Sequence, residues 1–194
     1  GNTGWSYDDV LPFFKKMENY QGEITEVRST EGPLKISEVV DRNPIYEGLF
    51  KGAEEIGIPI NKDYNGHEQE GISYTQTTIF KGERMSAEVA YLKPIRSRKN
   101  LTIITNSLVT KLLFNGKTCI GVKVKNKNKI NEFFAQNEVI LCGGAINSPQ
   151  ILELSGIGNR SILEEKGISL VHELKGVGEN LRDHLGPRLV YNIT

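Results

Sequence analysis

Two stretches near the start of the chain repeat apolar residues every three or four positions, the spacing of a helix with one buried face. The first begins at Ser6 and Asp9, whose separation is typical of a capped helix start, and continues to Met17. Pro12 falls inside it, and because proline removes a backbone hydrogen bond we expect a kink or a restart there. A second helix is predicted over 45–56, after an Asn-Pro pair and before a glycine.

The middle of the chain changes from helical to strand-like patterning. A polar loop is predicted over 63–71, a strand over 74–80, and a helix over 86–92 that ends at a proline. Asn115-Gly116 is a strong hairpin signal. The short β-prone runs around it are 101–105, 108–114, 119–124, 132–135 and 138–142. Together they predict a β-meander that leads into a buried strand.

The last part of the chain returns to mixed patterning. A capping box at 161–164 predicts a short helix that stops at Gly167, and a strand is predicted over 168–174. Helices and strands therefore alternate throughout, and the predicted fold class is α/β, of the mixed α+β kind.

Composition excludes several classes of function. Of the 194 residues, 38% are hydrophobic and 25% are charged, as in ordinary globular proteins. Basic and acidic residues number 24 each, so no overall charge attracts nucleic acid or anionic lipid, and the basic run 123–129 is interpreted as a solvated strand end. No stretch approaches the roughly 20 apolar residues that cross a bilayer. Cys119 and Cys142 fall in predicted strands, and we expect buried reduced thiols there, with no metal site.

The most informative pattern follows the apolar run 139–142. Gly143 and Gly144 come directly after it, and Ser148-Pro149 is a helix-start pair. A buried strand, a glycine pair and a helix form a turn that holds a dinucleotide against the backbone, although a tight packing corner gives the same local pattern. The residue types indicate a binding surface and no reactive centre.

The longer run 144–158 resembles the second signature of the glucose-methanol-choline (GMC) oxidoreductases, which use FAD to oxidise alcohols. Other blocks resemble the same family in the same order along the chain, namely 4–14, 82–87, 90–92, 100–102 and 176–184. The resemblance implies part of an FAD-binding Rossmann-like domain with a β-meander, interleaved with part of a substrate-binding α+β domain. The implied pieces are a substrate-domain portion (1–82), an FAD-domain portion (83–183) and the start of a second substrate-domain segment (184–194).

The resemblance also implies which residues contact FAD. A backbone contact to the adenine is implied for Val109. Close passage of the main chain along FAD is implied for Gly143, Gly144 and Ala145. A place at the domain crossover is implied for Asn180, Asp183 and His184. The alternatives are a core strand position, a packing corner, and a structural hydrogen-bonding role for the histidine. The residues concerned are Val109, Gly143, Gly144, Ala145, Asn180, Asp183 and His184.

The function implied is oxidation of the CH–OH group of a small-molecule alcohol, with hydride transfer to the flavin. No catalytic residue is assigned, because the family's phosphate-binding loop falls before Gly1 and its catalytic histidine pair beyond Thr194; we expect a fragment that is inactive alone. Choline-oxidising relatives tend to carry a glutamate where this chain has Gly186, so an uncharged or aliphatic primary alcohol is expected.

Other points stay open at the level of sequence. The electron acceptor is undetermined, and so are targeting signals, with the cytoplasm as the favoured location. The alternative functions are a hydroxynitrile lyase of the same family that keeps FAD, and a non-catalytic nucleotide-binding domain.

Overall fold

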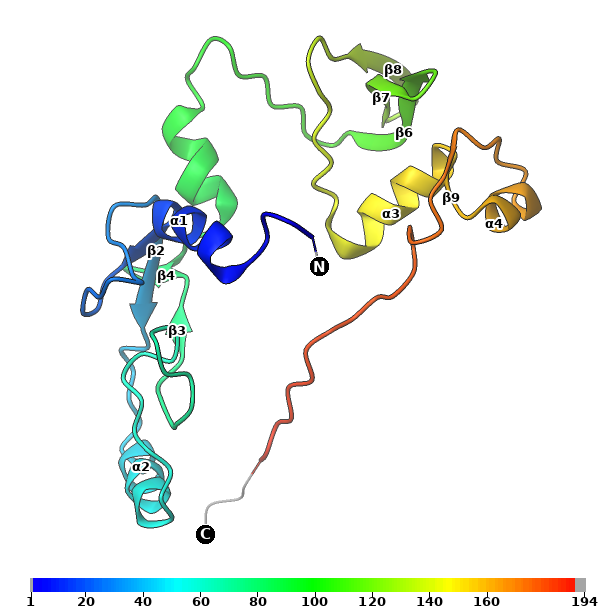
Figure 1. Cartoon of the computed structure of the whole chain (residues 1–194). Coiled ribbons are helices and arrows are strands. Elements are labelled where there is room, and N and C mark those ends of the chain that lie inside the picture. Colours follow the sequence, from blue (N-terminus) through cyan, green and yellow to red (C-terminus); the bar gives the residue numbers. More distant parts are fainter. Residues whose placement is uncertain (1, 191–194) are drawn as a thin grey trace. The chain divides into compact units, whose positions relative to one another are not determined.

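The structure is a computed structural model, and it describes residues 2–190. The last four positions of the predicted segment 184–194 lie outside the described residues. The chain forms two compact units, Gly1–Thr102 and Ile103–Thr194, here called unit 1 and unit 2 (Figure 1). Unit 1 extends past residue 82, where the sequence predicts a domain boundary, and that boundary remains a prediction.

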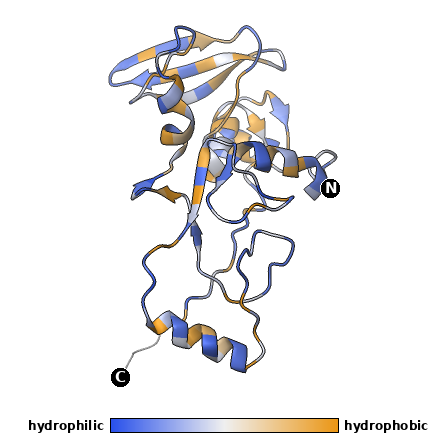
Figure 2. Ribbon diagram, turned by 90° about the vertical axis from the view of Figure 1, so that its left-hand side faces the viewer, coloured by the Kyte–Doolittle hydropathy of each residue, from blue (hydrophilic) through white to orange (hydrophobic). Residues whose placement is uncertain are grey.

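Unit 1 opens with helix α1, Tyr7–Met17, which begins as predicted. The Ser6 hydroxyl accepts the Asp9 backbone N–H at 3.3 Å, and the Asp9 carboxylate accepts the Ser6 backbone N–H at 3.1 Å, so two otherwise free donors at the helix start are satisfied. The helix continues through Pro12 without restarting. Its apolar stripe is visible as alternating colours in Figure 2.

Five short strands follow the helix in unit 1. Strand β1 (Glu18–Tyr20) pairs in parallel with β2 (Leu34–Glu38), and β2 pairs antiparallel with β3 (Gln76–Thr77). Strands β4 (Ile79–Phe80) and β5 (Glu83–Arg84) form a separate antiparallel pair. The predicted strand over 74–80 is therefore present as two short pieces.

A buried arginine joins the segments of this small sheet. Arg28 is 4% exposed; its guanidinium donates to both carboxylate oxygens of Glu18, at 2.7 and 3.0 Å, and to Asp63 Oδ1 at 2.7 Å. The same group donates to Gln76 Oε1 at 3.1 Å and lies 3.7 Å from the centroid of the Tyr20 ring. These five residues, which we call the Arg28 cluster, connect β1, the loop after it, the 60s loop and β3.

Two further helical segments belong to unit 1. Helix α2 spans Ile45–Glu55 and ends before Gly57, whose φ of +84° suits glycine, as predicted. The helix expected over 86–92 is a π-helical turn, Glu88–Leu92, followed by a 3-10 turn, Lys93–Ile95. Pro94 has no N–H to donate, and the Lys93 N–H bonds five residues back to Glu88, which explains the wider turn.

Unit 2 begins with the predicted meander. Strands β6 (Leu108–Asn115), β7 (Thr118–Asn126) and β8 (Lys129–Phe134) pair antiparallel in chain order, and Gly116 takes the positive φ of the hairpin turn. Apolar and polar residues alternate along these strands in Figure 2, and Leu112 and Val124 are among the buried side chains.

The remainder of unit 2 packs helix α3, Gly144–Leu154, against β6. Strand β9 (Ile157–Gly158), helix α4 (Arg160–Glu165) and strand β10 (His172–Glu173) follow, with β9 and β10 parallel. The mixed α/β class predicted from the sequence is confirmed. Among the described residues no helix is long and apolar enough to span a bilayer.

Several local predictions for unit 2 and the segment before it are wrong. The runs 101–105 and 138–142 form no strand, because a strand needs a neighbour and no described segment pairs with either. Cys142 is consequently exposed, whereas Cys119 on β7 is half-buried. Helix α4 is capped by Asn159, whose side-chain oxygen accepts the Ser161 N–H at 3.1 Å, so its start precedes the predicted box.

Candidate cofactor-binding site

The glycine corner leads directly into helix α3. Gly143 is the N-cap, and the helix begins at Gly144, four residues before the start predicted at Ser148. Ser148 still satisfies a donor at the corner, because its hydroxyl accepts the Gly143 N–H at 3.0 Å. No side chain of the N-cap residue covers the first turn of α3, so its backbone N–H groups can face an anionic ligand.

The two corner glycines are required for different reasons. A Cβ at Gly143 would lie 3.2 Å from both the Asn147 Cβ and the Ser148 nitrogen, so this glycine allows the chain to pack on its own helix. Gly144 has φ +82°, a conformation that L side chains rarely adopt, and a Cβ there would meet nothing within 4 Å. A side chain at position 143 would therefore crowd the helix, whereas the space beside Gly144 is open.

A cleft of about 460 Å³ follows the corner along α3. One wall is the helix itself, and the other is the chain around the glycine-rich run 176–178. The residues lining it are Ala145, Ile146, Ser148, Pro149, Gln150, Leu152, Glu153, Gly176, Val177, Gly178, Glu179 and Leu181. The structure thus brings together two sequence blocks, 144–158 and 176–184, that the family resemblance singled out.

The second block passes close to the Glu153 side chain on the helix. A Cβ at Gly178 would lie 2.9 Å from Glu153 Oε1, and Gly178 has φ +79°. A Cβ at Gly158 would lie 3.3 Å from Glu153 Cγ. The sequence did not single out Glu153 or Gly178 as site residues, although Gly178 belongs to the block 176–184 that resembles the family. The signal was present, but nothing local indicated that a carboxylate 25 positions earlier would lie against that glycine.

Val109 lies on β6, the edge strand that packs against α3. It is half-buried, pairs with Val124, and precedes a bulge between Val109 and Lys111. A core strand position accounts for its side chain, while its strand edge belongs to the same unit as the glycine corner. A bulge re-aims the backbone locally, which is the feature a backbone contact would use.

The polar residues predicted at the crossover lie in an exposed, irregular segment. Asn180 has φ +57° and sits between two cleft residues, Glu179 and Leu181. Asp183 Oδ1 accepts the backbone N–H of His184 at 2.9 Å, and both residues are exposed. Of the seven predicted contacts, the structure places Ala145 in the cleft wall and does not bring Asp183 or His184 there.

The chemistry offered by this cleft is that of a holding surface. Within the described ranges its lining has no histidine, cysteine or lysine. Its walls are apolar side chains, backbone, two glutamates, a serine and a glutamine, and a cleft of this size is within the usual range for small-molecule sites. Such an arrangement orients a ligand against the main chain.

The fold and this glycine-cornered cleft define a class of protein. A family model described as GMC oxidoreductase matches residues 1–186, and the chain belongs to that family. Among curated proteins, it is 41% identical over 185 residues to the mitochondrial choline dehydrogenase of Homo sapiens, covering 95% of this chain and 31% of that protein. It is 42% identical to the oxygen-dependent choline dehydrogenase of Brucella anthropi, covering 95% of this chain and 34% of that protein. The chain thus spans about a third of the length of these relatives.

Solved structures of flavin-dependent and other oxidases share the fold. An FAD-dependent oxidoreductase from Chaetomium thermophilum matches 94% of this chain and 34% of its own, with a TM-score of 0.88 and 32% identity. A formate oxidase matches 95% of this chain and 33% of its own, with a TM-score of 0.85 and 29% identity. A fungal aryl-alcohol oxidase at 22% identity and a TM-score of 0.80 shares the fold.

Proposed function

We propose that this chain is part of an FAD-dependent oxidoreductase that acts on the CH–OH group of an alcohol. The observation that carries the proposal is the match to two choline dehydrogenases at 41 and 42% identity over 95% of the chain, with the glycine corner and its cleft intact. Bound FAD would accept a hydride from the alcohol carbon. The residues described here contribute to holding it.

The glycine corner fits such a cofactor in chemistry and in space. The open side of Gly144 leaves room for a flat ligand against the backbone, and the first turn of α3 offers N–H donors to an anion. Ala145 lines the adjoining cleft. We propose Gly143, Gly144 and Ala145 as main-chain contacts, and the backbone of Val109 as the adenine contact.

Asn180, Asp183 and His184 complete the proposed set. Asn180 lies between two cleft-lining residues, and the other two follow it in the exposed segment. Their place at the crossover between domain pieces 83–183 and 184–194 supports a role beside the cofactor once the whole enzyme is assembled. The cytoplasmic location expected from the sequence stays a prediction.

The substrate proposed is a small uncharged or aliphatic primary alcohol. The relatives named above are choline dehydrogenases, so choline is the natural comparison compound. Gly186 is exposed and carries no carboxylate to hold a trimethylammonium group. The electron acceptor is proposed to be a quinone or another redox partner.

Anaerobic flavin bleaching tests the proposal. The product of the complete reading frame that contains this chain is purified with FAD, and choline and 1-butanol are added separately without oxygen. The expected result is loss of the yellow flavin absorbance with 1-butanol, and weaker or no loss with choline. A flavin that stays oxidised with every alcohol, together with cleavage of a hydroxynitrile, would instead establish the lyase.

A further inference from the structure

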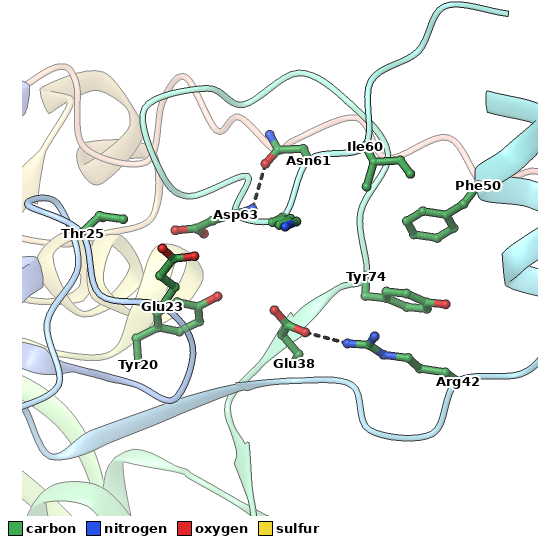
Figure 3. A pocket seen from close by; sticks show the side chains of 11 residues that line it. Tyr20, Glu23, Thr25, Glu38, Arg42, Phe50, Ile60, Asn61, Asp63 and Tyr74 are labelled. Carbon is green, nitrogen blue, oxygen red and sulfur yellow. Dashed lines mark hydrogen bonds and ion pairs between the residues drawn. The ribbon is translucent and has the colours of Figure 1, made fainter. Parts of the chain in front are cut away.

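The charged side chains around the cavity of unit 1 are largely paired with one another. This cavity has a volume of about 420 Å³, and in its wall Glu38 pairs with Arg42 at 2.8 Å (Figure 3). Asp63, also in the wall, pairs with Arg28 at 2.7 Å. These ion pairs satisfy the charges within unit 1. Unpaired charge of one sign gathers instead on the β-meander of unit 2.

The meander is a region of local positive charge in a chain that has no net charge. Residues 108–134 contain six lysines and one acidic residue, Glu132, and the basic run 123–129 belongs to this stretch. Lys123 has a partner, since its Nζ lies 3.2 Å from Glu132 Oε1. The other five lysines are exposed and have no ion-pair partner among the described residues; they are Lys111, Lys117, Lys125, Lys127 and Lys129.

The strand pairing places lysines and apolar residues on the same face of the sheet. Directly paired residues of neighbouring strands share a face, and so do alternate residues along one strand. One face therefore consists of three rows that run from β6 through β7 to β8, and we call it the lysine face. The rows are Leu108, Lys125 and Ile130; Lys111, Lys123 and Glu132; and Leu113, Gly121 and Phe134.

The two faces of the sheet differ in how they treat their apolar residues. The opposite face carries the buried side chains Leu112 and Val124. On the lysine face, Leu108, Ile130 and Phe134 are each 65–67% exposed. A sheet face that only meets water usually carries polar residues at such positions. Three large apolar side chains exposed among unpaired lysines therefore indicate a face that contacts an apolar and negatively charged partner.

We propose that the lysine face binds the surface of an anionic membrane. The lysine ammonium groups attract anionic lipid head groups, and the exposed apolar side chains enter the boundary between head groups and acyl chains. A membrane surface offers negative charge and an apolar layer together, which matches the two residue types of this face. The proposal goes beyond alcohol oxidation, because the face contains no residue that lines the cofactor cleft.

Vesicle sedimentation tests the membrane. The product of the complete reading frame is mixed with vesicles of phosphatidylcholine alone, or of equal parts phosphatidylcholine and phosphatidylserine, and the bound fraction is measured after centrifugation. The mixed vesicles are expected to bind at least about tenfold more tightly, because each lysine at an anionic surface contributes about fivefold. Added salt should weaken this binding. Equal binding to both vesicles, or binding to neither, would overturn the proposal. The readout does not depend on the flavin, so failure here leaves the proposed oxidoreductase untouched.

Lysine variants locate the binding. Lys111→Gln combined with Lys125→Gln removes two exposed charges from the lysine face, and binding to the mixed vesicles should weaken at least about tenfold. Lys51→Gln combined with Lys99→Gln is the matched control, because it removes the same charge from exposed positions of unit 1. The control should weaken binding by less than about twofold. An equal loss in both double variants would assign the effect to overall charge and contradict the meander as the binding surface.

Apolar variants separate a membrane from a soluble polyanion. Ile130→Thr combined with Phe134→Thr keeps strand-forming residues at exposed positions, so the fold should persist, as checked by circular dichroism. Vesicle binding should weaken at least about threefold, because less apolar surface leaves water. Retention on heparin, which has charge and no apolar layer, should not change. Val40→Thr, at an exposed position of unit 1, is the control. Vesicle binding that survives the double substitution unchanged would identify a polyanion site and contradict the membrane.

Discussion

The hydroxyl oxygen of Ser155 lies 2.8 Å from the backbone nitrogen of Leu112 and accepts its N–H. Ser155 is 1% exposed and Leu112 5%. The same hydroxyl donates to the carbonyl of Ile151, one turn back in α3. Strand β6 is an edge strand, so this side chain satisfies an edge donor that no neighbouring strand pairs with, and it bonds the helix of the cofactor corner to the meander.

Ser155→Ala should destabilise unit 2. The substitution leaves the buried Leu112 N–H without an acceptor, a loss of about 1–3 kcal/mol in the free energy of unfolding. Urea denaturation followed by circular dichroism measures the change. Ser97→Ala, at an exposed position, should shift the free energy by less than about 0.5 kcal/mol. Equal stabilities for both variants would show that the hydrogen bond makes no net contribution to the free energy of unfolding.

Gly144→Ala should reduce flavin occupancy. Alanine at φ +82° costs about 1–2 kcal/mol, and its methyl group enters the open side of the corner. Gly167→Ala is a matched control, because Gly167 has φ +68° and equally open surroundings but lies after helix α4, away from the start of α3. Both variants should lose similar stability, while only Gly144→Ala loses bound FAD by absorbance ratio. Loss of flavin from both to the same extent would limit Gly144 to a conformational role.

Arg28→Met should destabilise unit 1 far more than removal of an exposed arginine. It leaves the carboxylates of Glu18 and Asp63, whose side chains are 15% and 20% exposed, without their cation. The expected loss is about 3–5 kcal/mol. Arg42→Met breaks an exposed pair with Glu38 and should cost about 1 kcal/mol or less. Denaturant midpoints compare the two, and similar midpoints would contradict the structural weight given to the Arg28 cluster.

Tyr20 should ionise late in an alkaline titration. Burial, and then the charge of Asp63, raise its pKa in the folded protein, so the neutral phenol is favoured by folding. The stability linked to this group is therefore present below the unfolded pKa of about 10 and is lost as pH rises through the folded value. Phenolate absorbance of the folded protein measures the step. Tyr20→Phe should remove the latest step, and a late step that survives this substitution belongs to another residue.

The sequence predicted those elements whose causes are local. The capping box at Ser6 and Asp9 satisfies donors of its own helix start, the glycine after α2 ends its own helix, and Gly116 forms its own turn. All three features are present in the structure. The run 138–142 failed because apolar composition cannot supply the neighbouring strand that a ladder requires. The start of α3 was misplaced because Ser148 caps from within the second turn and not from in front of it.

The candidate site was predictable only in part. Both of its glycine-rich blocks were recognisable, since glycine at positive φ leaves a trace in sequence. The contact between Glu153 and Gly178 depends on tertiary packing and left none.

Strands β1 and β2 are parallel, yet residues 21–33 cross between them without a helix. Parallel neighbours usually depend on the apolar face of a crossover helix, and here a single guanidinium bonded to three side chains does that work. Evolution can consequently seldom replace one residue of this hydrogen-bonded group without replacing its partners. Across homologues, residues 18, 28, 63 and 76 should be inherited as a set, and exchanges at one of them should be accompanied by exchanges at the others.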